Sequence, residues 1–355
     1  MQGNRGLSDL EGRRIALIGG AGFIGHNLAL MLHACGAKVA IIDSLGVNNM
    51  LTFQSTDNHS PDRELYLDIT HQRLNLLREK AIELYVQDAR DYLALAKLMK
   101  KAAPDTFIHL AAVAHAGKSN KDPYTTFDHS LRTLENALDC ARSRCQHFIY
   151  FSSSMVYGDF TGASVTEESP CEPLGIYGAL KYAGEKIVIA YNQVFDLPYT
   201  IVRPSALYGE RCVSRRVSQI FIENALRGDD ITVQGDGSDR LDFTYIQDLC
   251  HGIIQVLARK QALNQIFNLT YGESCSVAQL VGILKQEFPN IRAHYQERDR
   301  LMPKRGTLNV DKARELIDYR PSWPLERGLP KYIEWYRSLN MWQPVEDRDG
   351  MVVSR

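Results

Sequence analysis

The fold is decided by residues 13–36, which read RRIALIGGAGFIGHNLALMLHACG. The first eight residues form a short apolar run that ends in glycines, a pattern typical of a buried β-strand. From Phe23 onward, apolar side chains recur at helical spacing until the chain reaches a closing glycine, Gly36. A strand that passes through a glycine-rich turn into a helix predicts the first unit of a parallel, helix-covered sheet.

The same alternation of strands and helices continues as far as Arg203. Residues 131–144 and 177–195 are the clearest predicted helices. The alternation predicts an α/β fold with a doubly wound parallel sheet of the Rossmann type. The further predicted strands are AKVAIID (37–43), TFIHLAA (106–112), HFIYFSS (147–153) and YTIVRP (199–204).

Beyond Arg203 the predicted strands are weaker and the loops longer, which indicates a smaller, mixed α/β lobe that holds the substrate. The connection from Asp43 to Asp88 is long for two neighbouring strands, so we interpret residues 48–83 as a partly helical insertion. QIFNLT (265–270) is expected to return to the main sheet. We assign residues 13–203 and 243–270 to the main domain, 204–242 and 271–340 to the lobe, and 341–355 to a loosely held tail.

Composition excludes several classes of function. The 355 residues are 45% hydrophobic and carry a net charge of −1, which fits a full core and argues against nucleic acid or an acidic membrane as partner. We find no apolar run near the ~18 residues of a membrane span and no signal-peptide core at the start. The seven cysteines are scattered without zinc-binding spacing. We therefore expect reduced thiols, no metal site and a cytoplasmic location.

The turn GGAGFIG (residues 19–25) has the spacing of a dinucleotide-binding site. It matches G-x-G-x-x-G from its second glycine and G-x-x-G-x-x-G from its first. Missing side chains let backbone N–H groups reach a pyrophosphate at the start of the helix. The predicted cofactor contacts in the turn are Gly19, Gly20, Gly22, Phe23, Ile24 and Gly25.

Two acids extend this predicted site. Asp43 ends the second strand, 18 residues after Gly25, where a carboxylate accepts from the adenosine ribose hydroxyls and repels a 2′-phosphate. The following residues, SLGVNN, contain no arginine or lysine, so NAD is favoured over NADP. Asp88 is a candidate contact of the adenine, and a solvated acid at the end of a strand is the alternative.

Tyr177 and Lys181 lie four residues apart in a predicted helix, so both side chains leave the same face. An ammonium group beside a phenol is expected to lower the pKa of the phenol from its usual ~10 toward the range of a general base. The interpretation of this pair as catalytic is supported by the glycine turn and by the serines at residues 152–154.

Five motifs stand in a familiar order: GGAGFIG, HLAA (109–112), FSSSMVYG (151–158), Tyr177-x3-Lys181 and Arg203-Pro204. This order resembles extended short-chain dehydrogenases/reductases over roughly residues 13–338. It is most similar to the NAD-dependent epimerase/dehydratase family, which acts on nucleotide sugars. The resemblance implies a homodimer that pairs through the helix of Tyr177 and the helix before it.

The resemblance also implies roles for individual residues. Tyr177 would remove a proton from a sugar hydroxyl while a hydride moves to the nicotinamide. Lys181 would lower the tyrosine pKa and hold the nicotinamide ribose. Ser153 would hydrogen-bond the oxygen that becomes a ketone, and Ala111, in HLAA, would contact the cofactor.

Met155 separates the possible reactions. Related 4,6-dehydratases have a glutamate at this position, and that glutamate drives proton removal at C5. Methionine has no titratable group, so the resemblance favours a sugar-nucleotide 4-epimerase that works through a 4-keto sugar, with the hydride taken up and returned by bound NAD. A dehydratase with another acid, a ketosugar reductase or dehydrogenase, and an inactive NAD-binding module remain as alternatives.

The diphosphate of the substrate is expected to meet basic residues. The family often has an arginine directly before the Asp-Phe of RDFxYVxD, whereas this chain has Leu241 there and Arg240 one residue earlier. A shift of one residue on a strand turns a side chain to the other face. Arg240 therefore binds phosphate only if a bulge restores its direction, while Arg305 occupies the family's second basic position.

Three more residues are candidate contacts of the sugar. Ser154 adjoins Ser153, and His115 and Ser119 lie on the predicted loop after HLAA.

Overall fold

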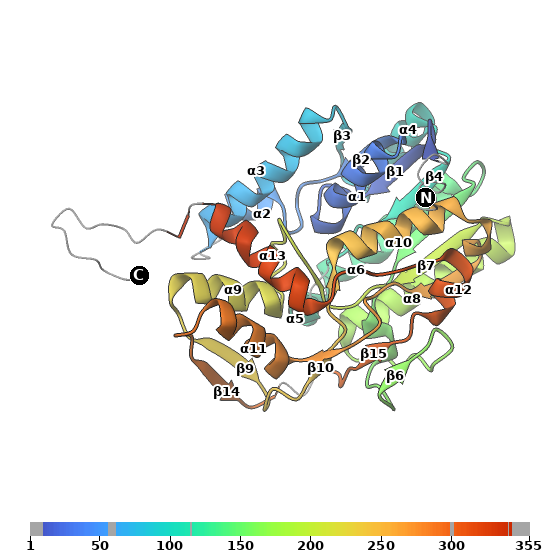
Figure 1. Cartoon of the computed structure of the whole chain (residues 1–355). Helices are drawn as coiled ribbons and strands as arrows, with labels where there is room; N and C mark the ends of the chain where they lie inside the picture. Colours follow the sequence, from blue (N-terminus) through green and yellow to red (C-terminus); the bar gives the residue numbers. More distant parts are fainter. Residues whose placement is uncertain (1–9, 56–61, 114–115, 299–301, 340, 343–355) are drawn as a thin grey trace, which may run out of the picture.

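The computed structural model describes residues 10–55, 62–113, 116–298, 302–339 and 341–342. At its centre is a seven-stranded parallel sheet with the order β12-β7-β5-β4-β1-β2-β3 (Figure 1). The doubly wound sheet predicted from the sequence is thereby confirmed. Its strands are β1 (Arg14–Ile18), β2 (Lys38–Asp43), β3 (Glu83–Val86), β4 (Thr106–His109), β5 (His147–Phe151), β7 (Tyr199–Arg203) and β12 (Gln265–Asn268).

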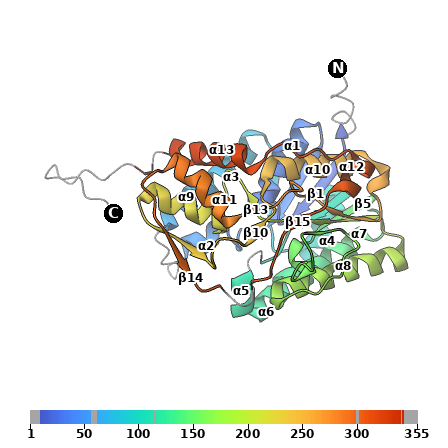
Figure 2. The ribbon, with the colours of Figure 1, turned by 60° about the horizontal axis from the view of Figure 1, so that its bottom comes forward.

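Helices cover both faces of this sheet (Figure 2). One layer contains α1 (Phe23–Ala34), α3 (Arg63–Glu79) and α10 (Ile246–Ala258), and the other contains α4 (Tyr92–Ala102), α7 (Thr133–Ala141) and α8 (Gly175–Phe195). A separate apolar core fills the space under each layer. Because both faces are covered, the central strands are buried along nearly their whole length, and continuous apolar runs mark them in the sequence.

The segment 48–83 is partly helical, as expected, but it forms the crossover that leads from β2 into β3 at Glu83, so its interpretation as an insertion was wrong. It contains α2 (Met50–Gln54) and α3, and α3 packs against α1. The apolar face of α3 buries Leu65, Ile69 and Leu77 at four- and eight-residue spacing. β3 lies at the edge of the sheet, where Val86 is 64% exposed. A half-exposed edge strand lacks the apolar run that marks a central one.

The loop expected after HLAA is helical from residue 116 onward. α5 (Ala116–Lys121) and α6 (Pro123–Phe127) lead into a π-helix, Asp128–Arg132, which joins α7. Asp122 caps α6 by accepting a hydrogen bond from the Thr125 N–H at 3.0 Å, and Pro123 takes the first helical position. Helices of five or six residues show too few apolar repeats to be recognised by periodicity.

Past β7 the chain builds a smaller lobe from helices and short strand pairs. α10 and β12 return from it to the sheet, where α10 packs on α1 and β12 pairs with β7. The core under α1, α3 and α10 continues without interruption into this lobe. The strand pairs are β6 (Ser164–Val165) with β15 (Thr307–Leu308), β8 (Leu207–Tyr208) with β11 (Thr244–Tyr245), β9 (Ile231–Gln234) with β14 (Ala293–Gln296), and β10 (Arg240–Leu241) with β13 (Cys275–Ser276). The helices are α9 (Val217–Arg227), α11 (Val277–Glu287), α12 (Asp311–Ile317) and α13 (Leu325–Ser338).

All seven cysteines are free thiols. Within the ranges that the structure describes, every helix is too short or too polar to cross a bilayer.

A buried ion pair joins α8 to β7. Arg203 donates to both carboxylate oxygens of Glu185, at 2.9 and 2.7 Å, and the two side chains are 3% and 1% exposed. Arg203 also donates to the Tyr157 hydroxyl at 2.9 Å, and this hydroxyl donates to the Asn268 side chain of β12 at 2.8 Å. The network therefore ties α8 to the strands at one side of the sheet.

Breaking this pair is expected to be costly, because a lone buried carboxylate has no counter-charge. The Arg203→Met variant should lose about 3–5 kcal/mol of unfolding free energy in urea. Arg14→Met, which removes an exposed pair with Asp105 at 2.8 Å, is the matched control and should lose at most about 1 kcal/mol. Similar losses in the two variants would contradict the assignment of the Arg203–Glu185 pair as a structural anchor.

Candidate active site

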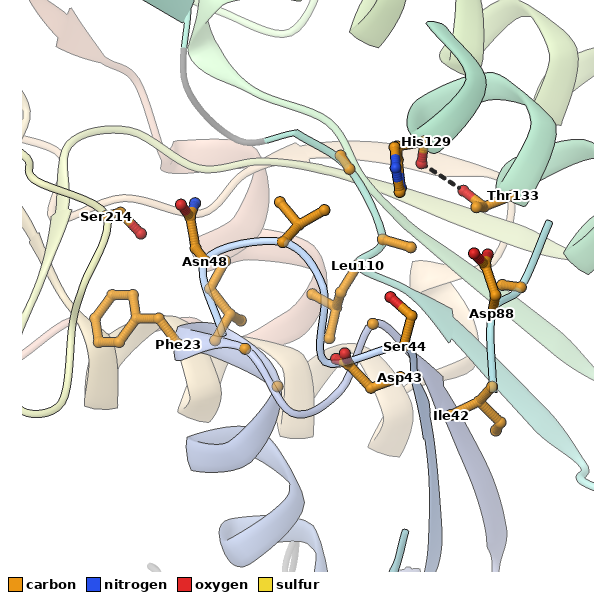
Figure 3. Close-up of a pocket in the computed structure, with 18 of the residues that line it drawn as sticks. Phe23, Ile42, Asp43, Ser44, Asn48, Asp88, Leu110, His129, Thr133 and Ser214 are labelled. Carbon is orange, nitrogen blue, oxygen red and sulfur yellow. Dashed lines mark hydrogen bonds between the residues drawn. The ribbon is translucent and has the colours of Figure 1, made fainter. Parts of the chain in front are cut away.

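A cleft of about 900 Å³, including the solvent at its mouth, lies at the carboxyl edge of the sheet (Figure 3). It sits where the strand order reverses beside β1, the usual binding place in open parallel sheets. The turns after β1, β2, β3 and β4 line it, together with the π-helix and the segment before α9.

The glycine turn forms the wall of the cleft after β1. Gly19 has φ +80°, and a Cβ there would lie 2.6 Å from the Ala111 backbone nitrogen. The turns after β1 and β4 can therefore meet only because residue 19 lacks a side chain. Gly20 is outside the lining of the cleft and packs under Gly25, whose Cβ would lie 2.4 Å from the Gly20 carbonyl oxygen. The other predicted contacts of the turn line the cleft: Gly22, Phe23, Ile24 and Gly25.

Asp43 closes the turn from the end of β2. Its carboxylate accepts hydrogen bonds from the backbone N–H groups of Ala21 (2.9 Å) and Leu45 (2.8 Å). Burial raises the pKa of this carboxyl group, and the two hydrogen bonds and the charge of Arg73 oppose the rise. Asp43 and Ser44 both line the cleft (Figure 3), so a contact with a ribose stays a prediction that the position allows.

Asp88 lines the cleft at the end of β3 and is held by a neighbour. Arg90 binds it with a shortest distance of 2.6 Å and also binds Asp128, the first residue of the π-helix, at 2.7 Å. The hydrogen bond from Arg90 lowers the pKa of Asp88. The bridge places the π-helix beside the cleft, where His129 and Thr133 line it (Figure 3). Single-turn π-helical segments within α-helices are frequent at functional sites.

Tyr177, Lys181 and Ser153 meet where α8 crosses the end of β5. The Lys181 Nζ donates to the Phe151 carbonyl oxygen at 2.7 Å and lies 5.2 Å from the centre of the Tyr150 ring. Ser153 follows β5, begins a 3₁₀ turn at Ser154–Tyr157, and lies near enough to the Tyr177 phenol to lower its pKa. The structure thus brings together the three residues that the sequence named as catalytic candidates.

The electrostatics of Tyr177 differ from expectation. Burial raises the pKa of Tyr177, and the charge that opposes the rise comes from Arg216, with help from the Ser153 hydrogen bond. Burial also lowers the pKa of Lys181 to about 8, against the pull of Glu185. The expected lowering of the tyrosine pKa by Lys181 was therefore wrong. Helical spacing revealed the neighbour but not the loss of solvent, which penalises the charged form of both groups.

Three arginines of the lobe form an arginine cluster: Arg216, Arg298 and Arg305. In the described part of the chain, each has one buried nitrogen without a hydrogen-bond partner: Nε of Arg216, Nη2 of Arg298 and Nε of Arg305. Burial, followed by the charge of Arg216, lowers the pKa of Arg305 to about 10, and Arg298 adds to the effect. Neighbouring guanidinium groups with spare donors suit an anion with several oxygens, such as a diphosphate.

Arg240 lines a different cavity from the cleft. It donates to the Ser274 hydroxyl at 3.0 Å and to the Ser274 carbonyl oxygen, and it lines a second cavity with Tyr271 and Glu273. Leu241, in the position of the family's arginine, is packed in the core. The Arg240 side chain is therefore bound to Ser274 and is not part of the lining of the cleft.

Of the three candidate sugar contacts, two are buried and one lies outside the described residues. Ser154 is buried in the 3₁₀ turn, where its N–H donates to the Pro204 carbonyl oxygen at 2.9 Å. Ser119 is fully buried on α5 instead of lying on a solvated loop. His115 lies outside the described residues. Ala111 lines the cleft, as expected for a cofactor contact.

Sequence reasoning missed two arginines that line the cleft, Arg73 and Arg216. Arg73 is 1% exposed, and its Nε donates to the Arg211 carbonyl oxygen at 2.9 Å. A signal for it existed, because Arg73 falls four residues from both Ile69 and Leu77 on the apolar face of α3. Arg216 had no such signal, since the basic residues before α9 look alike in the sequence.

Replacing Lys181 by methionine is expected to stabilise the fold at neutral pH. Below about pH 8 the lysine is protonated in both the folded and the unfolded chain, so the folded state bears the full cost of a buried charge. Between about pH 8 and about pH 10 the folded lysine loses its proton first, and the stability of the wild type rises. Urea unfolding should show an advantage for Lys181→Met on the order of 2 kcal/mol at pH 7 that shrinks at pH 10. An advantage independent of pH would contradict the lowered pKa.

Comparison with known proteins identifies the family of the chain. A family model described as "NAD dependent epimerase/dehydratase family" matches residues 15–270. The chain is 29% identical to an uncharacterised UDP-glucose epimerase, YtcB, of Bacillus subtilis over 92% of this chain and 98% of the relative. It is 26% identical to UDP-glucuronate 4-epimerase 4 of Arabidopsis thaliana over 92% of this chain and 76% of the relative.

Two solved structures share the fold. The UDP-glucuronic acid 4-epimerase of Bacillus cereus, in complex with UDP-glucuronic acid and NAD, superposes with a TM-score of 0.80 at 24% identity, covering 92% of this chain and 99% of the other. A double mutant of the dTDP-glucose 4,6-dehydratase DesIV of Streptomyces venezuelae gives a TM-score of 0.81 at 24% identity, covering 93% of this chain and 98% of the other. Because the family model matches residues 15–270, which are most of this chain, the chain belongs to the NAD-dependent epimerase/dehydratase family.

Proposed function

We propose that the protein is a nucleotide-sugar epimerase that inverts C4 through a transient 4-keto sugar. The observation that carries the proposal is the chemistry around Tyr177. Met155 stands where a dehydratase would have its glutamate, and no carboxylate among the described residues contributes to the pKa shift of Tyr177. Inversion at C4 needs one group that gives and takes a proton, whereas dehydration needs a second acid. The names of the curated relatives support the same reaction class.

NAD is the cofactor of the family, and the cleft fits it. Gly19 and Gly22 line the cleft, and a Cβ at Gly19 would clash with the Ala111 backbone nitrogen, which lies on the opposite wall. The first turn of α1 has no side-chain cap, so its N–H groups are available to a pyrophosphate. Asp43 lines the cleft at the place expected for a ribose. When bound, NAD supplies a hydride acceptor that returns the hydride to the other face of the sugar.

Tyr177 performs the proton transfer in this proposal. As the phenolate it takes the proton of the C4 hydroxyl, and it gives the proton back when the ketone is reduced. Ser153 holds the same oxygen while it changes between hydroxyl and ketone. Arg216 favours the phenolate, and Lys181, fixed by the Phe151 carbonyl oxygen, holds the nicotinamide ribose.

The arginine cluster holds the diphosphate, which leaves the sugar free to turn between the two hydride transfers. Its donors come from the lobe, while the NAD-binding turns come from the main sheet. We therefore retain residues 13–203 and 243–270 as the NAD-binding half, and residues 204–242 and 271–340 as the substrate-binding half.

The proposal is tested by incubating the protein with UDP-glucose, UDP-glucuronate and their GDP, dTDP and CDP counterparts, with products identified by NMR. We expect C4 epimers without net formation of NADH, which absorbance at 340 nm would reveal. The Tyr177→Phe variant should be slower by about 10²–10⁴-fold while it still binds NAD. The Tyr157→Phe variant, which alters a tyrosine of the structural network, is the matched control and should keep turnover within a few-fold.

Other outcomes identify the alternatives. A 4-keto-6-deoxy product would mean that a carboxylate replaces the glutamate missing at Met155. Stoichiometric change in nicotinamide absorbance would indicate a reductase or dehydrogenase. Full turnover by Tyr177→Phe would overturn the assignment of the acid–base group.

We also propose a homodimer that pairs through α8 and the helices before it. α6 packs beside α8 (Figure 2). These two helices expose Tyr124 (86%), Phe127 (51%) and Val194 (68%). Large exposed apolar side chains on neighbouring helices suit a self-complementary interface.

Light scattering should give twice the 40.1 kDa mass of the chain. The double variant Phe127→Glu/Val194→Glu should be monomeric, because charges would face each other across the interface. Tyr295→Glu is the control, since Tyr295 is 55% exposed on β14 of the lobe and should stay dimeric. A monomeric wild type at micromolar concentration would contradict the homodimer.

A further inference from the structure

The crossover helix α3 contacts the lobe through a group of polar side chains, which we call the α3–α9 cluster. Its members come from α3 and its start, from α9 and its flanks, and from α13. They are Asp62, Tyr66, Arg215, Gln219, Glu223, Arg227 and Tyr336. Arg215 directly precedes Arg216, the arginine that lines the cleft and acts on Tyr177.

Asp62 lies between the two ends of α9. Its carboxylate binds Arg215, just before the helix, at 2.8 Å, and it also binds Arg227 in the last turn. Asp62 is 5% exposed, whereas the side chains of Arg215 and Arg227 are 44% and 25% exposed, so these charge-assisted hydrogen bonds are buried on the carboxylate side alone. The ion pair between Asp62 and Arg215 therefore fixes the segment before α9 to the NAD-binding half.

Glu223 anchors the same helix from its other side. It is 1% exposed and accepts hydrogen bonds from Tyr66 of α3, from Tyr336 of α13 and from Gln219, each at 2.8 Å. A buried carboxylate with three donors is fully satisfied, and such networks favour one arrangement of the chains that carry them. Gln219 is thus held in place, and its side-chain oxygen accepts from the Arg215 backbone N–H at 2.9 Å.

Arg215 has a left-handed backbone conformation, with φ +50°. A residue with a Cβ adopts it at a cost of about 1–2 kcal/mol, so the surrounding contacts must hold it there. Both the side chain, through Asp62, and the N–H group, through Gln219, do so. The next residue, Arg216, returns to an extended conformation (φ −79°, ψ 161°) at the start of α9. The left-handed turn therefore sends Arg215 toward α3 and Arg216 into the cleft.

We propose that the α3–α9 cluster positions Arg216 for the diphosphate of the substrate. Asp62 and Arg215 are positioning residues, which act through the backbone turn and not by touching substrate. Without the cluster, Arg215 would relax to negative φ and swing the Arg216 guanidinium away from Arg305. This gives the crossover segment a part in substrate binding although its helix belongs to the NAD-binding half. The inference rests on the proposed role of Arg216.

The experiment measures the Kd of UDP by calorimetry on the full chain, with KM and kcat for the epimerised substrate alongside. Arg216→Ala gives the loss of UDP affinity against which the other variants are compared. It should weaken UDP binding about 10- to 100-fold, as loss of charged hydrogen bonds does. Arg215→Ala should weaken it about tenfold and raise KM, with kcat within threefold of the wild type. Arg215→Gly should stay within threefold for Kd, because glycine adopts positive φ without help from Asp62.

Two further variants separate positioning from stability. Asp62→Asn should raise Kd about fivefold, and this effect should vanish in the Arg215→Gly background, where the turn no longer depends on the ion pair. Arg227→Met removes a second partner of Asp62 but leaves the Arg215 pair intact. It should lower the melting temperature and leave Kd within twofold of the wild type.

The results distinguish the positioning role of the α3–α9 cluster from the proposed binding role of Arg216. If Arg216→Ala weakens UDP binding while Arg215→Ala and Asp62→Asn bind as the wild type does, the cluster is only structural and the inference fails. If Arg216→Ala binds UDP as the wild type does, or the wild type does not bind UDP, the role of Arg216 fails and the inference fails with it. Equal weakening by Arg215→Gly and Arg215→Ala would also overturn positioning through the turn.

Discussion

A buried ammonium group, that of Lys181, sets the requirement on which the catalytic half of the structure depends. A charge inside a protein must meet dipoles or an opposite charge, because water no longer solvates it. The Phe151 carbonyl oxygen, the face of Tyr150 and the nearby Glu185 meet this requirement. Glu185 in turn needs Arg203. Satisfying one charge thus brings α8 onto the ends of β5 and β7, and Tyr177 reaches Ser153 as a result.

The substrate side follows the opposite rule, since its charges are gathered and left partly unsatisfied. Arg216, Arg298 and Arg305 each retain a buried donor without a partner among the described residues. Guanidinium groups that repel one another are retained in a fold only where other contacts hold them, and here α3 and α9 supply such contacts around Arg216. The site therefore combines a neutralised cation beneath the chemistry with a cluster of three arginines beside it, of which Arg298 is paired with Asp239 at 2.8 Å. The first favours a fixed geometry and the second favours an anionic ligand.

The sequence predicted what depends on neighbours along the chain. The glycine turn, the central strands and the spacing of Tyr177 and Lys181 are local patterns, and each was found in its expected place. What depended on distant residues was missed. The position of Arg216 depends on Asp62, 154 residues earlier, and the charge that acts on Tyr177 comes from the lobe. The pKa expectation failed because burial has no local signature. Segment 48–83 was misjudged because β3, at the exposed edge, gave no strand signal.

The apolar core under α1, α3 and α10 continues into α9, α11 and α13. Swinging the lobe away as a rigid body would expose that interior to water, at about 25 cal/mol for each Å² of apolar surface. The two halves therefore lack the hinge that lets many two-lobed enzymes open and close. Ligands must therefore reach the cleft through its mouth, which is open to solvent. In the proposed epimerase, a cleft that stays assembled would retain its dinucleotide between turnovers, as chemistry that regenerates its own oxidant requires.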